Sequence, residues 1–550
     1  MPQTQLFQLQ QVDAEDGYFS GGLVYAHNLV PARAGWVAMA ERQAIQVSNT
    51  PSGVAPKAVF ETRLPFTAKL YMAGLKSGAG EVYELTSSAT AIGPSLTTSN
   101  YPWTFLEFGD RLIVVNFDNA IKQRAAHAGA LTNLVSSTLV PQAFVACVAR
   151  SHLVLGNTYE SATSYVQRVR WSARDDASDF DPSDATRSNY VDLTDNLGMI
   201  VGLEGGDNVT VFKTDGIQLL EYTGGTTYWQ RYTLAKNIGC AGTKSIVPWR
   251  GDLYFFSGNG FWVVKANGEV KELENKQLRQ LLRAPTAEYP VPMDGSIVFE
   301  AQWNAFGEVG PWGAVDPVSG VIFWLFTGRQ YGAAGSGTYD HFAVCYHPDS
   351  GRWSTADGFT GTGESSGQVS GVGIASRAVV SPSSALTAQV GSKYAWPRSG
   401  LVWALANPSD GTGVFAGGQS VRPWKIRTGP LIGQPVSFEA ARFWVAGGWV
   451  GHGGPHESGS PAARVIAAAD PGVTLVGQQN STLPAAQSIA ANGFYAASST
   501  ATGVDGWMSF DPFIASFFQL ELSVDSSIDP TRVEAVELRF TPVGQERLQK

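Results

Sequence analysis

The chain has 550 residues, of which 44% are hydrophobic and 15% charged, with a formal net charge of −9. This length exceeds what one hydrophobic core supports, and the apolar content excludes a disordered acidic chain. The net negative charge argues against electrostatic binding of nucleic acid. The 61 glycines, 29 prolines, 28 phenylalanines, 18 tyrosines and 16 tryptophans predict turns and strands rather than helices.

One hairpin pattern recurs along residues 61–424, after an N-terminal segment at 1–60. It consists of a Gly, Asp or Arg turn, four to six apolar residues, a Gly/Asn turn and a second strand. The clearest copies are LEFGDRLIVVNFDNAIKQR from Leu106 and PWRGDLYFFSGNGFWVVKANGEV from Pro248. The first apolar residues of six such strands are Leu70, Leu112, Leu153, Val209, Leu253 and Val321, and the steps between them are 42, 41, 56, 44 and 68 residues. The shorter steps match a four-stranded propeller blade of about 40 to 50 residues, so we expect an all-β, six-bladed β-propeller.

The two longer steps predict insertions. The first holds ARDDASDFDPSDATRSNYVDLTD from Ala173, and the second holds ENKQLRQLLRAP from Glu274. In the second, Leu278, Leu281 and Leu282 lie on one helical face and Pro285 ends the pattern, which predicts a helix. Two Gly/Ser-rich loops follow, from Gly328 and Gly358. The strand-like run SGLVWALAN from Ser399 then closes the ring or begins a linker.

Residues 425–550 have a different sequence pattern. PVSFEAARFWVAGGWVG from Pro435 predicts a strand with a glycine bend. FFQLELSVDSS from Phe517 alternates apolar and polar residues, and VEAVELRFTPVG from Val533 does the same through Val536, Leu538 and Phe540. Such alternation is typical of antiparallel strands with one wet face, so we expect a C-terminal antiparallel β-sandwich-like domain.

Cysteines and termini add little chemistry. Cys147, Cys240 and Cys345 lack metal-ligand spacing and are too few for a disulfide scaffold, so we expect structural thiols in a chain folded in a reducing compartment. MPQTQLFQLQ at the start lacks the basic and apolar regions of a secretion signal, and no apolar run reaches 18 residues. We therefore expect neither a secretion signal nor a membrane span.

Candidate metal sites are weak. His341 with His347, and His452 with His456, are the local histidine pairs, and the glycine loop HGGPH does not hold two imidazoles as a helix does. The acidic string contains Asp175, Asp176, Asp179, Asp181 and Asp184, but lacks the glycine and terminal glutamate of a calcium loop. Surface turns are the expectation for both, and we assign no metal and no cofactor.

Catalytic motifs are equally weak. GESSG around Ser365 has Gly/Ser loop on both flanks, where a nucleophile elbow needs a strand and a helix. NIGCAGTKS from Asn237 lacks the glycine bracket of a phosphate loop, so Lys244 is expected in an edge strand. The carboxylate spacing that glycosidases need cannot be read from sequence, and HPDSGRW from His347 is a single, partial match to the Asp-box turn that sialidase-type blades repeat. We assign no catalytic residue and expect a protein that is not an enzyme.

Tryptophans raise a carbohydrate hypothesis, because an exposed indole stacks on a sugar ring. Trp262 in FWVV and Trp324 in IFWLF fall inside apolar strands, where burial is expected.

Three runs together resemble the propeller segment of tail nozzle proteins of short-tailed bacteriophages. They are RVRWSARDDASDFDP from Arg168, DLTDNLGMIVGLEGGDNVTVFKTDGIQLLEY from Asp192, and NIGCAGTKSIVPWRGDLYFFSGNGFWVV from Asn237. LVYAHNLVPARAG from Leu23 resembles the Asn-x-x-Pro opening of the same family, without its usual arginine-proline-glycine continuation, and the strands from Lys425 onward are similar to its closing β-domain. The resemblance is close over about 165–265 and loose over most of the remaining chain.

This resemblance implies a structural virion protein that forms a homohexameric tube below the portal and its adaptor ring. The subunit would be assembled in the host cytoplasm, would contact the adaptor and a fibre, spike or plug protein, and would let genome DNA pass through its lumen without specific binding. A net acidic wall suits that passage, because it repels phosphate. We expect residues 175–195 or the Gly/Ser loops of 328–373 to face the channel or neighbouring subunits.

Two other functions remain open from the sequence. A carbohydrate-binding or carbohydrate-active propeller accounts for the aromatic residues. A bacterial interaction propeller without a phage role predicts a monomer.

Overall fold

The structure is a computed structural model of the 550-residue chain. It describes residues 2–8, 23–33, 35–38, 42–45, 54–62, 69–76, 79–85, 89–93, 96–97, 101–134, 140–182, 187–225, 228–258, 260–273, 278, 282, 298–302, 311–315, 320–331, 338–356, 373–375, 393–398, 401–406, 424–428, 436–445, 448–449, 461–468, 494–499, 507–515, 517–524 and 532–542.

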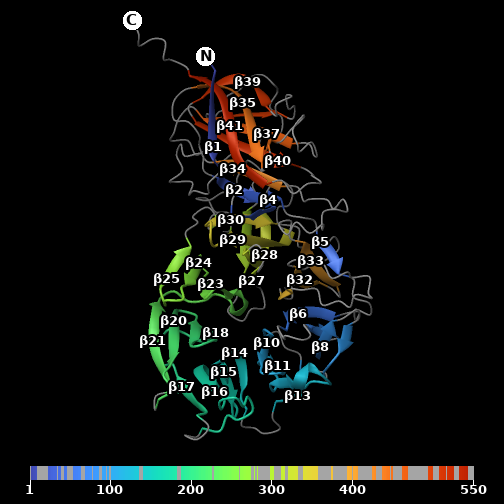
Figure 1. Ribbon diagram of the computed structural model, residues 1–550, viewed down its shortest axis with the longest axis vertical. Helices are drawn as coiled ribbons and strands as arrows, with labels where there is room; N and C mark the ends of the chain where they lie inside the picture. Colours follow the sequence, from blue (N-terminus) through green and yellow to red (C-terminus); the bar gives the residue numbers. More distant parts are fainter. Residues whose placement is uncertain are drawn as a thin grey trace.

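Antiparallel sheets follow one another around a ring (Figure 1). Among the described residues six of them are separate four-stranded sheets, which confirms the predicted all-β propeller class. Five are made of consecutive strands: β6 (Val54–Glu61), β7 (Leu70–Lys76), β8 (Ala79–Leu85) and β9 (Ala89–Ala91); β10 (Thr104–Phe108), β11 (Arg111–Val115), β12 (Lys122–Arg124) and β13 (Thr132–Asn133); β14 (Gln142–Ala149), β15 (His152–Glu160), β16 (Thr163–Trp171) and β17 (Asn189–Asp192); β18 (Ile200–Glu204), β19 (Val209–Lys213), β20 (Gly216–Tyr222) and β21 (Trp229–Lys236); and β22 (Val247–Trp249), β23 (Asp252–Phe256), β24 (Phe261–Val264) and β25 (Val270–Leu273). These five sheets are called blades 1 to 5 below.

The ring closes through strands from its two ends. β31 (Gly373–Ala375), β32 (Lys393–Arg398) and β33 (Leu401–Ala406) form the sixth separate sheet together with β5 (Arg42–Ile45) from the N-terminal segment. Val402 lies opposite Ile45 in the antiparallel register. The run around Val402 therefore closes the ring, because pairing the first and last strands removes a free sheet edge.

A further four-strand group continues into a larger sheet. β27 (Trp312–Val315), β28 (Ile322–Tyr331), β29 (Thr338–His347) and β30 (Arg352–Ala356) pair in succession, and β26 (Val298–Gln302) pairs with the far half of β28. We call β27–β30 blade 6. It belongs to a ten-stranded sheet that extends beyond the ring. Among the described residues, blades 1 to 6 and the closing sheet give the ring seven sheets, so the predicted count of six blades is wrong. The closing sheet was missed because one of its strands, β5, comes from the N-terminal segment.

Local turn chemistry explains the hairpins that the sequence predicts. Gly109 and Asp110 form the two-residue loop between β10 and β11, and Gly109 has φ +58°. Arg250 (φ +51°) and Gly251 (φ +88°) form the loop between β22 and β23. Two consecutive positive φ values in the second loop, and a glycine at positive φ in the first position of the first loop, give tight turns whose twist matches paired strands. The six sequence markers lie in, or directly before, the second strands β7, β11, β15, β19, β23 and β28.

Apolar runs in these strands serve two cores at once. In β11, Leu112 and Val114 pack into the cluster shared with blade 1, whereas Ile113 and Val115 pack into the cluster shared with blade 3. Phe255 in β23 likewise faces blade 4. Alternate side chains point to opposite faces of a strand, so a strand covered on both faces is apolar throughout.

Both termini build a second body, at the top of Figure 1. β3 (Leu29–Pro31), β4 (Trp36–Ala38), β41 (Arg532–Pro542), β35 (Val436–Val445) and β36 (Gly448–Trp449) pair in that order, with β1 (Gln3–Gln8) on β41 and β39 (Met508–Ala515) on β35. β2 (Leu23–His27), β34 (Trp424–Thr428), β40 (Phe517–Val524), β37 (Pro461–Ala468) and β38 (Phe494–Ser499) continue the ten-stranded sheet. Val536, Leu538 and Phe540 are buried, as the alternation of β41 predicts. The predicted segment 1–60 thus contributes strands to the second body, to the closing sheet and to blade 1.

The N-terminal run from Leu23 also joins the two bodies. His27 pairs in parallel with Thr355 of β30, and the backbone N–H of Asn28 donates to the Thr355 carbonyl at 2.7 Å. Arg352 donates from Nη1 to the carbonyl oxygens of Ala32 (3.1 Å) and Arg33 (2.7 Å). We call these contacts the seam.

Other expectations meet mixed outcomes. Trp324 is fully buried, whereas Trp262 is only partly buried against the core between blades 4 and 5. The three cysteines are free and buried. The predicted helix from Glu274 falls mostly outside the described residues, although Leu278 and Leu282 are buried and joined by an N–H to carbonyl bond of one helical turn.

Candidate functional site

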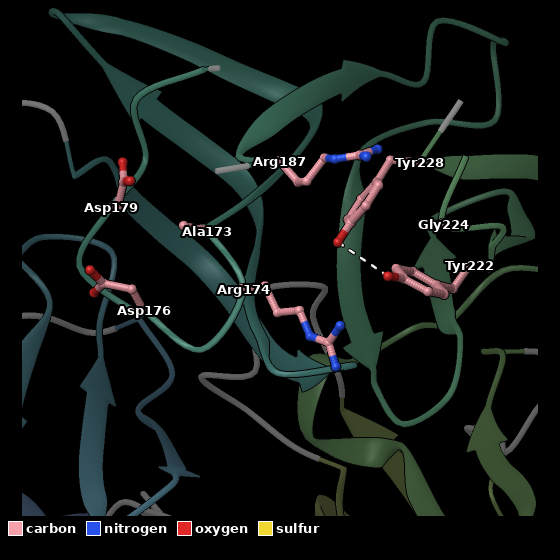
Figure 2. A pocket seen from close by; sticks show the side chains of 8 residues that line it. All are labelled: Ala173, Arg174, Asp176, Asp179, Arg187, Tyr222, Gly224 and Tyr228. Atoms are coloured by element: carbon pink, nitrogen blue, oxygen red, sulfur yellow. Dashed lines mark hydrogen bonds between the residues drawn. The ribbon is translucent and has the colours of Figure 1, made fainter. Parts of the chain in front are cut away.

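A pocket of about 530 Å³ opens between blades 3 and 4 (Figure 2). The insertion between β16 and β17 supplies one wall, and the β20–β21 loop region supplies the other. Its lining comprises Ala173, Arg174, Asp176, Asp179, Arg187, Tyr222, Gly224 and Tyr228. This volume lies in the range of small-ligand sites.

The insertion is anchored although its described residues form no strand. Phe180 is buried in the core between blades 2 and 3, and its carbonyl accepts a hydrogen bond from Nη2 of Arg170 at 2.7 Å. The N–H of Asp175 donates to Ser151 at 2.8 Å, and Nε1 of Trp171 donates to the Arg187 carbonyl at 2.7 Å. These bonds fix both ends of the wall that carries the arginines.

A directional hydrogen-bond chain runs from the pocket into the core. His152 is fully buried, and its Nδ1 lies 2.7 Å from the Ser172 carbonyl, so Nδ1 must carry the proton. Its Nε2 therefore accepts from the hydroxyl of Tyr228 at 2.9 Å, which in turn accepts from the hydroxyl of Tyr222 at 3.2 Å. Burial lowers the pKa of His152, which favours this neutral form.

Two guanidinium groups act on the same tyrosine. The Arg187 guanidinium lies 5.6 Å from the ring centroid of Tyr228 and donates to the Gly225 carbonyl at 3.1 Å. Arg174 contacts Asp175 at 3.7 Å, with both side chains largely exposed. Both arginines favour the ionised form of Tyr228, but burial dominates and, together with the neighbouring Tyr222 side chain, raises the pKa of Tyr228 to about 12.

Pocket carboxylates are directed elsewhere. Asp176 accepts from the N–H and hydroxyl of Ser178, and Asp179 accepts from the N–H of Asp181 at 2.9 Å. Figure 2 shows both aspartates on the side opposite Tyr222 and Tyr228, whereas the arginines point toward the tyrosines. The pocket therefore has a cationic, hydroxyl-bearing half, which suits binding of an anion. A tyrosine nucleophile is disfavoured, because Tyr228 stays protonated at neutral pH.

Lys244 and Glu204 form a charged pair at the middle of the ring. Lys244 is in the 3₁₀ helix η2 (Thr243–Ser245) before blade 5, and its Nζ donates to the Trp103 carbonyl before blade 2. The expectation that Lys244 lies in an edge strand is therefore wrong, because η2 turns its side chain toward the opposite blade. Burial lowers the pKa of Lys244 to about 8 and raises that of Glu204 to about 7, each opposed by the charge of the other.

Among the described sequence candidates, Asp176 and Asp179 line the pocket. Asp175, Asp176, Asp179 and Asp181 form turns, while Asp184, Ser365, His452 and His456 lie outside the described residues. His347 is buried and its Nδ1 lies 2.9 Å from the hydroxyl of Ser350, and His341 is in β29. Within the described part of the chain, no group of three His, Cys, Asp or Glu is arranged to hold a metal, and no helix has the length and hydropathy of a membrane span. Sequence reasoning missed Arg174, Arg187, Tyr222 and Tyr228, and the two tyrosines flanking the turn TGGTT were the available signal.

Comparison with known proteins leaves the function open. No family model and no curated protein matches the chain. One solved structure with similarity is the extracellular domain of a putative hybrid two-component system from B. thetaiotaomicron, at 14% identity and a TM-score of 0.32. The match covers 60% of this chain and 41% of that one. The chain thus spans less than half of that structure.

Proposed function

We propose that the chain is a structural subunit of the tail nozzle of a short-tailed bacteriophage, located in the virion tail below the portal and adaptor. The sequence resemblance over about 165–265 supports this role, and these residues form blade 3 from β16, all of blade 4 and most of blade 5. The observation that carries the proposal is the way the two ends of the chain are paired. Strands from both ends of the chain close the ring and join it to the second body.

Such an architecture suits a rigid conduit. A closed ring has few free sheet edges, and its blades are held by cores on both faces. The net charge of −9 disfavours adhesion to a passing polyanion. In this proposal six subunits form the tube, the adaptor binds one end, and a fibre, spike or plug protein binds elsewhere.

Assembly with its neighbours tests the role. The chain is co-expressed with the portal and adaptor proteins encoded beside its gene, and the product is imaged by electron microscopy. A six-fold ring below the adaptor is expected, with residues 175–195 or 328–373 at the lumen or at subunit contacts. A gene neighbourhood without portal or adaptor genes would contradict the proposal, and both segments on the outer, partner-free surface would reject the placement.

A second function, saccharide binding, is favoured by one observation. The pocket between blades 3 and 4 combines tyrosine hydroxyls with guanidinium groups on an anchored wall. Glycan-array binding by the purified chain tests it, and a parallel hydrolysis screen tests the carbohydrate-active alternative.

A further inference from the structure

The pocket half that holds the tyrosines carries two arginines whose charge is only weakly compensated by nearby side chains. Arg174 and Arg187 both act on the Tyr228 hydroxyl, which stays protonated and so supplies no anion. Arg174 forms a long, exposed ion pair with Asp175 at 3.7 Å. Arg187 donates one hydrogen bond to a neutral group, the carbonyl of Gly225. Guanidinium groups in such a position bind carboxylate or phosphate with charge-assisted, often bidentate, hydrogen bonds.

The hydroxyl chain adds a second recognition element of opposite polarity. Because the proton of Tyr222 is donated to Tyr228, and that of Tyr228 to His152, the Tyr222 oxygen offers lone pairs to the pocket. A ligand hydroxyl can donate to them. Tyr222 and Tyr228 are half-buried, so their rings also offer apolar surface beside the polar groups.

Free space lies beside Gly225, the neighbour of the pocket residue Gly224. A Cβ added at Gly225 would meet no atom within 4 Å, and Gly224 has φ +67°, a conformation that favours glycine. The opposite wall is held by Trp171 and Phe180, as described above. The arginines are thus presented on an anchored surface, which reduces the ordering cost of binding.

From this combination we infer that the pocket binds a saccharide bearing a carboxylate, with the carboxylate between Arg174 and Arg187 and a ring hydroxyl on Tyr222. A carboxylate satisfies the guanidinium groups, and the hydroxyls of the same sugar satisfy the acceptor that a simple anion would leave unused. The inference rests on the saccharide-binding alternative above and is independent of the nozzle role.

The test is calorimetric titration of the full chain with trigalacturonate and sialyllactose as acidic probes. Galactotriose is the neutral probe, and inorganic phosphate is the simple anion. At least one acidic probe is expected to bind at least ten-fold more tightly than galactotriose and phosphate, with affinity falling as salt rises.

Variants locate the site. Arg174→Gln leaves the anchoring bonds of the wall intact, and it is expected to weaken acidic-probe binding at least ten-fold. Arg187→Gln should also weaken acidic-probe binding at least ten-fold, and Tyr222→Phe should weaken it several-fold. Arg250→Gln is the matched control, since it removes an equally exposed arginine of blade 5 that pairs with Asp349. It should leave binding unchanged.

The alternative outcomes are distinct. Equal affinity for galactotriose would overturn the carboxylate specificity while leaving saccharide binding in place. If the chain binds phosphate but neither acidic probe, the proposal that the ligand is a saccharide is overturned. Absence of binding to all three saccharides would overturn both this inference and the saccharide-binding alternative. Acidic-probe binding that is unchanged in Arg174→Gln would place the site elsewhere and overturn the assignment.

Discussion

The amine of Lys244 donates a hydrogen bond to the carbonyl oxygen of Trp103, although the two residues precede blades 5 and 2 and are 141 positions apart. These blades are not neighbours in the ring, so the bond crosses its middle. Glu204, at the end of β18, lies close enough to Lys244 for each charge to stabilise the other. Lys244, Glu204 and Trp103 thus link blades 5, 4 and 2, in a contact that no local sequence pattern predicted.

Removal of the lysine should be more damaging at high pH. In Lys244→Met, Glu204 loses its nearby cation, and the cost of ionising this partly buried carboxyl rises. We expect the melting temperature to fall relative to the unmodified chain, by more at pH 8 than at pH 6, because Glu204 can stay neutral at the lower pH. Scanning fluorimetry at both values measures this. Lys236→Met, an exposed lysine of β21, is the control; an equal loss at both pH values would contradict the pairing.

The carboxyl of Glu204 should make stability fall between about pH 4.5 and pH 7. Its folded pKa is raised to about 7 from an ordinary value of 4.5, so the folded state holds a proton in this window that the unfolded state has released. Stability then decreases with rising pH, by at most about 1.4 kcal/mol per pH unit for one proton. Glu204→Gln should flatten this dependence in melting curves from pH 5 to pH 7. A variant with the same slope as the unmodified chain would show that Glu204 does not titrate there.

The seam between the two bodies should depend on Arg352. Its guanidinium donates to two carbonyls, lies 5.2 Å from the Trp36 ring, and is partly buried. Arg352→Gln should reduce the free energy of unfolding by about 1–3 kcal/mol, since two acceptors lose a charged donor. Faster proteolysis near residues 32–36 is the expected readout. Arg250→Gln, which removes an exposed ion pair with Asp349 and a guanidinium contact with the Trp249 ring, is the control and should change stability little. Equal cleavage rates in the two variants would argue against the seam.

The three cysteines should be unreactive in the folded chain. Burial raises the pKa of Cys240 to about 11 and of Cys345 to about 12, and it also raises that of Cys147. Thiolate is the reactive form, so a thiol reagent at pH 8 should modify none of them until denaturant is added. The absorbance of the leaving group that the reagent releases measures how many thiols have reacted. Rapid labelling of any cysteine in the native chain would contradict its buried position.

Strand pairs were readable from the sequence because their determinants are local. The turn Gly109-Asp110, the apolar run from Leu112 to Val115, and the equivalent turn before Leu253 each specify two adjacent strands within a few residues. Repetition of that unit was enough to predict a propeller. The six markers did not include the sheet of β31, β32, β33 and β5, because one of its strands comes from residues 42–45 and no pattern near Val402 indicates which distant strand pairs with it.

Local sequence thus determined which residues form hairpins and which side chains are apolar on both faces, since turn geometry and strand alternation act over short spans. Tertiary structure alone decided the ring closure, the position of Lys244 against Trp103, and the meeting of Arg174 and Arg187 with Tyr222 and Tyr228. Each of these depends on the angle and distance between sheets, which are set by how complete cores fill the space between blades. A charged side chain therefore has no fixed neighbour until that packing brings its partner within reach.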